Sequence, residues 1–86
     1  MRTDIYLKLI GVFKTRSQAG KACSGGFVKS RGKVLKSASG VARGDLLEVV
    51  KPDGRILHIK ITELPGSRQV SRRDRGKYCE ITEAEA

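Results

Sequence analysis

Residues 13 to 36 hold the side chains best suited to chemistry, because nearly every polar position there is a cation or a hydrogen-bonding group. Thr15 can cap the free amides at the start of a helix, and Gln18 can reach back to complete a capping box. Arg16 then stands in the first helical turn, where a cation opposes the helix dipole but is well placed to hold an external anion. Helix starts commonly bind phosphate, so the sequence predicts a phosphate site here. The groups that could converge on it are the amides of residues 16 to 18, the Ser17 hydroxyl and the side chains of Lys14, Arg16 and Lys21.

A short helix and a tight hairpin must position these groups. The helix is predicted to end at Gly25-Gly26, where a glycine is free to take the left-handed conformation. Residues 27–29 and 33–35 then predict two short strands around a Ser30-Arg31-Gly32 turn, whose glycine supplies a positive φ. Four further cations lie on this hairpin, namely Lys29, Arg31, Lys33 and Lys36.

A first helix is predicted from Asp4 to Phe13, because its apolar residues recur at helical spacing. Its link to the second helix is tight, so the two must pack at a steep angle. The second helix carries a face of small residues, and Gly20 within it indicates close approach to another element. Lys8 lies on the exposed side of the first helix, and Asp4 is interpreted as a dipole partner or cap at its start.

Positive charge is distributed unevenly along the chain. The protein has 86 residues and a net charge of +9. Residues 1 to 44 contain ten lysines and arginines against the single carboxylate of Asp4, whereas residues 45 to 86 contain eight cations and eight anions. The whole excess therefore belongs to the half that holds the predicted phosphate site, as expected for a protein that binds nucleic acid.

The second half of the chain predicts a clear strand pair. Residues 46–51 and 55–64 flank a Pro52-Asp53-Gly54 turn, and alternating apolar residues give the second strand one core face. His58 on the opposite face is interpreted as an ordinary surface residue.

One domain is expected over residues 1 to 64, followed by a basic linker and C-terminal extension over residues 65 to 86 that packs on it or trails from it. The linker could contain a short helical turn and residues 78–82 could add an edge strand, after which residues 83–86 are expected to fray. Two interpretations of the linker cations stay open, since they could extend the nucleic-acid footprint or only solubilise a loop. These cations are Arg68, Arg72, Arg73, Arg75 and Lys77.

The sequence offers no constellation for catalysis or metal binding. His58 has no carboxylate pair, nucleophile or metal triad with it. Cys23 and Cys79 are isolated, so a zinc site would lack ligands and both are expected to be reduced thiols. The longest apolar run near the N-terminus is too short for a signal peptide or a membrane span. We therefore expect a cytoplasmic protein that is not an enzyme and uses no cofactor.

Aromatic stacking platforms are scarce. The chain has no tryptophan, and Phe13 and Phe27 sit in apolar patterns, which leaves Tyr6 and Tyr78 as candidates. Sequence-specific recognition of single strands depends on such platforms, so recognition of helical shape and phosphate spacing is favoured.

An ordered set of motifs over about residues 1 to 50 resembles the S-four RNA-binding domain, named for a small-subunit ribosomal protein. The set consists of Arg2-x-Asp4, Lys14-Thr-Arg16-Ser17-Gln-Ala, Gly26-x-Val28, Gly32, Val41 and Gly44-Asp45. The short stand-alone form is most similar to the fifteen-kilodalton heat-shock protein family and its relative, ribosome-associated quality-control cofactor P. In the S-four domain the hairpin turn normally has the sequence Val-Asn-Gly, whereas this chain has Ser30-Arg31-Gly32. Contacts made by the asparagine of that domain are therefore not expected here.

The resemblance implies an α+β fold in which two short N-terminal helices pack on a small, mainly antiparallel twisted sheet, the alpha-L motif. It also implies binding to large ribosomal subunits that still hold a peptidyl-tRNA after a stalled ribosome has split. The protein would contact ribosomal RNA and tRNA, and a nascent-chain quality-control factor would be a further partner. It would be a monomer and would not bind membranes. The alternatives are an accessory module working in trans with an RNA-modifying enzyme or a synthetase, a ribosome assembly factor, and a basic protein for DNA or anionic membrane.

The residues expected at the RNA surface are the cations and hydrogen-bonding groups of the first half. They are Arg2, Asp4, Lys8, Lys14, Thr15, Arg16, Ser17, Gln18, Lys21, Lys29, Arg31, Lys33 and Lys36. For Arg2 and Asp4, the resemblance implies that they help to order this surface together with Arg16.

Overall fold

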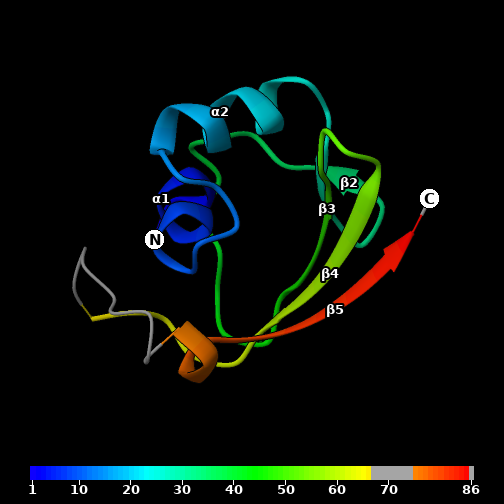
Figure 1. Ribbon diagram of the computed structural model, residues 1–86. Coiled ribbons are helices and arrows are strands. Elements are labelled where there is room, and N and C mark those ends of the chain that lie inside the picture. The colour runs from blue at the N-terminus through cyan, green and yellow to red at the C-terminus, as the bar shows by residue number, and fades with distance from the viewer. Residues whose placement is uncertain (67–74, 86) are drawn as a thin grey trace.

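The computed structural model describes residues 1–66 and 75–85, and it shows two helices on one five-stranded sheet (Figure 1). The elements are α1 (Thr3–Leu9), α2 (Arg16–Ser24), β1 (Val28–Ser30), β2 (Lys33–Val34), β3 (Leu46–Val50), β4 (Arg55–Ile61), the 3₁₀ helix η1 (Arg75–Lys77) and β5 (Cys79–Glu85). The sheet has the order β2-β1-β3-β4-β5, and every neighbouring pair is antiparallel. The predicted α+β class, with two N-terminal helices on an antiparallel sheet, is confirmed.

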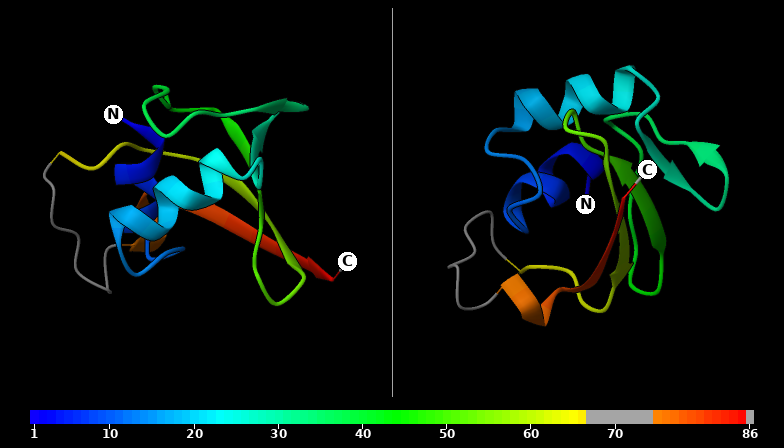
Figure 2. Two further views of the ribbon diagram at one scale, coloured as in Figure 1. Left: turned by 90° about the horizontal axis from the view of Figure 1, so that it is seen from above. Right: turned by 45° about the vertical axis from the view of Figure 1, so that its right-hand side comes forward.

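The helices lie on one side of the sheet, and the hairpin of β1 and β2 lies next to the C-terminal end of α2 (Figure 2). β3, β4 and β5 curve away beneath α1 (Figure 1). The start of α2 and the hairpin, which carry most of the candidate cations, therefore lie at the two ends of one short helix.

The first helix is shorter than predicted. α1 ends at Leu9 because Gly11 adopts a φ of 81°, a left-handed conformation that stops the helix. The amides of Val12 and Phe13 then turn back to the Leu7 carbonyl at 3.0 and 3.4 Å. Both side chains remain buried, so the apolar pattern predicted the core correctly but not the end of the helix.

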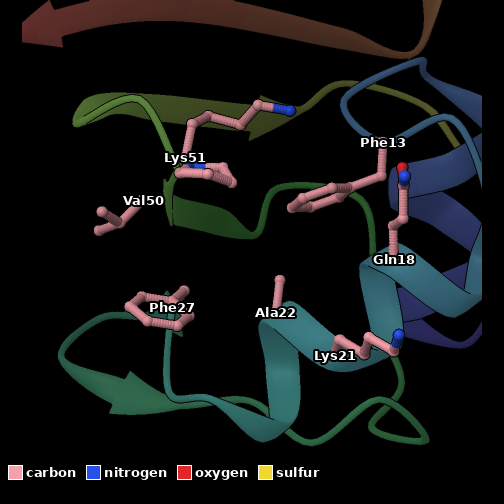
Figure 3. Close-up of a pocket in the computed structure, with 8 residues that line it drawn as sticks. Phe13, Gln18, Lys21, Ala22, Phe27, Val50 and Lys51 are labelled. Atoms are coloured by element: carbon pink, nitrogen blue, oxygen red, sulfur yellow. The ribbon is translucent and has the colours of Figure 1, made fainter.

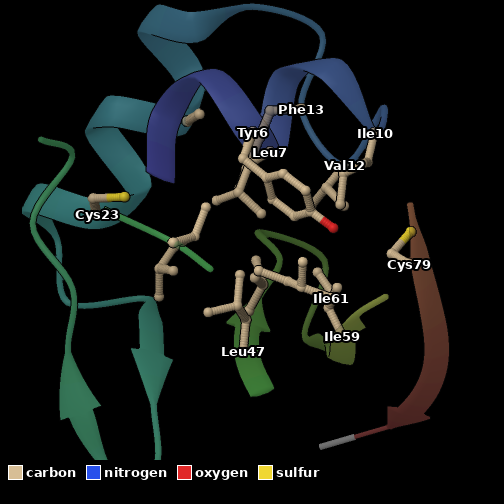
Figure 4. Packing of buried hydrophobic residues seen from close by; sticks show 14 residues of the cluster. Tyr6, Leu7, Ile10, Val12, Phe13, Cys23, Leu47, Ile59, Ile61 and Cys79 are labelled. Atoms are coloured by element: carbon tan, nitrogen blue, oxygen red, sulfur yellow. The ribbon is translucent and has the colours of Figure 1, made fainter. Parts of the chain in front are cut away.

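The core lies between the helices and the inner face of the sheet (Figure 4). Leu47 and Ile59 are cross-strand partners from β3 and β4, and both are buried. Tyr6 points from α1 toward these strands and is fully buried, and its hydroxyl donates to the Tyr78 carbonyl at 2.8 Å. Burial raises the pKa of this phenol, so Tyr6 stays a neutral donor. The prediction of Tyr6 as a stacking platform is therefore wrong.

The C-terminal strand is longer than predicted. β5 pairs with the whole of β4, from Arg55 opposite Glu85 to Ile61 opposite Cys79. The edge strand expected at residues 78–82 is present, but the residues after it do not fray, because their backbone pairs with the first half of β4 as far as Glu85. The helical turn expected in the linker is η1, whereas the predicted linker cations Arg68, Arg72 and Arg73 lie outside the described residues.

The hairpin turn is tighter than predicted. Ser30 pairs with Lys33, which leaves only Arg31 and Gly32 in the turn, with φ values of 51° and 84°. Two successive positive φ values characterise the type I′ turn, which favours Asn-Gly. Gly32 suits this conformation, but Arg31 holds a left-handed backbone that a long side chain disfavours.

Arg31→Asn is therefore expected to raise the free energy of unfolding by about 0.5–1 kcal/mol, because asparagine accepts the left-handed conformation more readily. Urea unfolding of the two proteins measures the difference. Arg43→Asn is the matched control, since Arg43 is also exposed in a turn but does not have a positive φ. An equal gain at both positions would show that loss of positive charge, and not backbone relief at residue 31, is responsible.

Candidate nucleic-acid interface

Arg2, Asp4 and Arg16 form a hydrogen-bonded cluster at the start of α1, which we call the arginine cluster. Arg2 donates from Nε and Nη2 to the two oxygens of Asp4, each at 3.2 Å, and Arg16 Nε donates to Oδ2 at 3.1 Å. The amide of Ile5 donates to Oδ1 at 2.8 Å. One carboxylate therefore orients two guanidinium groups that are far apart in the sequence, one just before α1 and the other at the start of α2.

The cluster presents its positive charge outward. The Asp4 side chain is 6% exposed, whereas those of Arg2 and Arg16 are 43% and 50% exposed. Burial alone would raise the pKa of Asp4, but hydrogen bonds from Arg16, Arg2 and the Ile5 amide outweigh it and hold the pKa below its ordinary value. Asp4 is thus an internal anion that orients two arginines. Within the described chain it engages only Nε of Arg16, so the terminal nitrogens of that guanidinium can bind an outside anion.

The loop after β2 holds the start of α1 in place. The amides of Thr3 and Asp4 donate to the carbonyls of Ser39 and Ser37 at 2.9 and 3.2 Å, and the Thr3 hydroxyl also donates to Ser39. These bonds satisfy the first amides of the helix, which has no side-chain cap at Arg2. Apart from the small residues of the loop, no sequence pattern indicated this contact. Lys36 comes directly before Ser37, so the loop joins the hairpin to the arginine cluster.

The helix start at α2 differs in part from the prediction. Thr15 is the N-cap, and its hydroxyl accepts from the Gln18 amide at 3.0 Å, as predicted. Among the described residues, the Gln18 side chain makes no return bond, so only half of the capping box forms. The Gln18 amide is therefore occupied, and the phosphate site predicted on the amides of residues 16 to 18 retains only those of Arg16 and Ser17.

Three of the remaining cations accompany Arg16. Lys8 borders a shallow depression together with Ile5, Leu9 and Arg16. Lys14 and Lys21 are exposed, the first beside the N-cap and the second within α2. These exposed lysines and the arginine cluster lie on α1, α2 and the link between them, and we call this set the basic surface.

The hairpin cations do not all share that surface. Ser30 is the partner of Lys33, and Lys29 is the partner of Val34 and of Glu48 on β3. Because cross-strand partners point to the same face and successive residues alternate, Lys33 lies on the face of Val28 and the core, whereas Lys29 lies on the outer face with Glu48. Lys33 thus lies on the helix side of the sheet, and Lys29 points away from it.

Gly20 does not have the role that the sequence suggested. A Cβ at this position would lie 3.9 Å from the Ser37 Cβ, which is an ordinary contact distance. The neighbour is the loop after β2, and alanine would fit.

One exposed aromatic ring was not expected from the sequence. Phe27 is 50% exposed, although its apolar neighbours predicted burial. Phe13 is buried as expected, and the ammonium of Lys51 lies 4.4 Å from the centroid of its ring while donating to the Val12 carbonyl. A signal for Phe27 was available, because it follows directly on the Gly25-Gly26 stop and so lies at an exposed corner.

The described residues do not bring together side chains for metal binding or nucleophilic catalysis. No set of three or more histidine, cysteine, aspartate or glutamate side chains among them could hold a metal ion. Cys23 and Cys79 are buried, and burial raises the pKa of both thiols, so they are poor nucleophiles. Among the described residues, no helix is long and apolar enough to cross a bilayer.

The fold and the site together define a small basic α+β domain with two N-terminal helices on an antiparallel sheet. In fold it is similar to the trimeric Heat Shock Protein 15 of Vibrio cholerae, with a TM-score of 0.84 and 23% identity over 95% of this chain and 81% of that one. It is also similar to the hypothetical protein HP1423, with a TM-score of 0.80 and 29% identity over 99% of this chain and 100% of that one. No protein-family model and no curated protein matches the sequence. The resemblance to the fifteen-kilodalton heat-shock proteins is thus confirmed for the fold, and the S-four assignment stays a prediction.

Proposed function

We propose that this protein binds structured RNA on the ribosome. The observation that carries the proposal is the arginine cluster, in which the buried carboxylate of Asp4 holds two half-exposed guanidinium groups on the basic half of the chain. Planar guanidinium groups bind phosphate through paired hydrogen bonds, and a fixed orientation lowers the entropy lost on binding. The likeness in fold to a heat shock protein of the fifteen-kilodalton family supports the same proposal.

The shape of the basic surface suits contact with two RNA segments. The arginine cluster lies at the start of α1 and α2, and Lys33 lies on the hairpin next to the far end of α2 (Figure 2). A helix of nine residues is about 13 Å long, so cations at its two ends can reach phosphates on separate strands. We therefore propose that the natural target is a large ribosomal subunit that carries a peptidyl-tRNA, contacted on both ribosomal RNA and tRNA.

The proposed role has further parts. The protein acts in the cytoplasm as a non-enzymatic monomer, and its electrically neutral half is left for a nascent-chain quality-control factor. Phosphate contacts supply most of the affinity, because binding releases counterions from the RNA.

Pelleting with purified large subunits tests this role. At physiological salt, subunits that carry peptidyl-tRNA are expected to retain more protein than empty subunits. With about six phosphates neutralised, the slope of log K against log salt is expected to be about −4 to −5. Equal retention on both kinds of subunit would reject the peptidyl-tRNA role and leave general RNA binding. A salt slope near zero would reject general RNA binding as well. Cosedimentation with a synthetase or a modification enzyme would favour the accessory role instead.

A further inference from the structure

An open apolar groove lies between α2 and the ends of β1 and β3, with a volume of about 440 Å³ (Figure 3). Phe13 and Phe27 border it from opposite sides, and Ala22 points into it from α2. Gln18 and Lys21 border it on the same helix. The groove therefore combines two aromatic rings with an amide and a cation.

The exposed ring of the groove is held on a rigid backbone. The Phe27 amide donates to the Ala22 carbonyl, and the Phe27 carbonyl accepts from the Val50 amide, both at 2.9 Å. The ring lies directly over Gly25, since a Cβ at that glycine would come within 2.6 and 2.8 Å of two ring carbons. Such a ring is presented in one orientation at little further entropic cost, which is what a stacking platform requires.

We propose that this groove receives an unpaired nucleobase of the bound RNA, which stacks on Phe27 while Lys21 neutralises a neighbouring phosphate. The inference rests on the proposed function, and it adds a site for a flipped or bulged nucleotide to a surface otherwise suited to phosphates. Bases of any sequence have a flat π face, so an aromatic ring binds them without strict sequence preference.

Charge favours a nucleotide over an apolar protein side chain as the occupant. Lys21 at the border of the groove belongs to the same helix as Arg16, and the first 44 residues carry the whole net charge of +9. Gln18 and Lys21 both border the groove on α2, so a nucleotide whose phosphate contacts Lys21 would hold its base beside the groove. Gln18 offers both a donor and an acceptor to the edge of a base. Lys51 also lines the groove and adds a second positive charge, and its ammonium is held by the Phe13 ring and the Val12 carbonyl.

The test uses two RNA hairpins that differ only in one bulged 2-aminopurine, whose fluorescence reports stacking. The wild-type protein is expected to bind the bulged hairpin at least about fivefold more tightly than the fully paired one, and to quench its fluorescence. Phe27→Leu keeps an apolar side chain but is expected to lose this preference, whereas Phe27→Tyr keeps a ring and is expected to retain it. Neither change should alter the affinity for the paired hairpin.

Two further variants guard against effects on folding. Gly25→Ala leaves the Phe27 side chain unchanged but displaces its ring, so it is expected to reduce the preference as Phe27→Leu does. Ile81→Ala is the matched control, because Ile81 is 46% exposed on β5, away from the groove, and should behave as the wild type.

The outcomes separate this inference from the proposed function. If the wild type binds both hairpins equally well with the expected salt dependence, the base site is wrong while RNA binding stands. The same holds if Phe27→Leu keeps the full preference, because the preference would then not depend on the Phe27 ring. If neither hairpin binds, the proposed function and the base site are both rejected.

Discussion

Asp4→Asn is expected to weaken RNA binding by about tenfold even though it makes the protein more positive. The buried carboxylate accepts from both arginines, and an asparagine offers one acceptor and one donor in the same space. At least one guanidinium would lose its partner and its orientation. A lost charge-assisted hydrogen bond in a partly buried site corresponds to about 1.5–3 kcal/mol, and a similar loss in the free energy of unfolding is expected.

The matched control for this variant is Asp45→Asn. It adds the same unit of positive charge, and the Asp45 Oδ2 accepts only from the Ala42 amide at 2.8 Å, which an asparagine oxygen can replace. Filter binding and urea unfolding of both variants measure the two effects. If Asp4→Asn bound RNA as tightly as Asp45→Asn, net charge alone would explain affinity and the arginine cluster would have no special part in it.

The contribution of Asp4 to stability should also depend on pH. Its folded pKa is lowered, so the stabilisation is fully present above the ordinary aspartate pKa of about 3.9 and is lost as the pH falls through the lower folded value. The difference in stability between the wild type and Asp4→Asn should therefore be constant near neutrality and shrink in acid below about pH 4. A difference that grew in acid would contradict the lowered pKa.

Arg16→Glu is expected to weaken RNA binding by about 10- to 100-fold, the largest effect of any single change considered for this chain. It removes an outward guanidinium, worth about 1.5–3 kcal/mol if it binds phosphate, and places a carboxylate where the RNA approaches. The salt slope should fall by about one unit, because one phosphate contact is lost. Filter binding over a range of salt concentrations measures both quantities.

Arg55→Glu makes the same charge change at a comparable exposure, and its effect on RNA binding should be much smaller. Arg55 is 49% exposed and pairs with Asp53 and Glu83 in the electrically neutral half. Both variants are expected to lose some stability, because Arg16→Glu brings a carboxylate next to Asp4 and Arg55→Glu brings one next to Asp53 and Glu83. Circular dichroism at the temperature of the binding assay must show both variants folded. Equal loss of binding in the two would contradict the assignment of Arg16 to the RNA surface.

Local features of the fold were predictable because local chemistry determines them. The Thr15 cap, the glycine stop after α2 and the Pro52-Asp53-Gly54 turn depend on residues within a few positions of one another, and all are present. The end of α1 was not predictable in this way. Gly11 is compatible with a helix at modest cost, and its left-handed conformation is selected by the packing of Val12 and Phe13.

The candidate site was predicted only in part, because its geometry depends on contacts between distant residues. A cation in the first turn of α2 indicated that Arg16 serves an anion, whereas its association with Asp4 was implied only by the family resemblance. Phe27 was expected in the core because periodicity does not show which end of a strand projects beyond the sheet. Phe27 follows the Gly25-Gly26 stop and borders the groove between α2 and the end of β3, which leaves its ring half exposed.

The hydrogen bond from the Tyr6 hydroxyl to the Tyr78 carbonyl joins residues 72 positions apart, and β5 begins only at Cys79. The core therefore cannot close during synthesis until Tyr78 and β5 have left the ribosome. Folding must wait for this long-range closure, so it is expected to be slower than the early helices alone would suggest. A nascent chain that stopped before residue 79 would leave the hydrogen-bonding edge of β4 without its partner strand, and such truncated products should be sensitive to proteolysis.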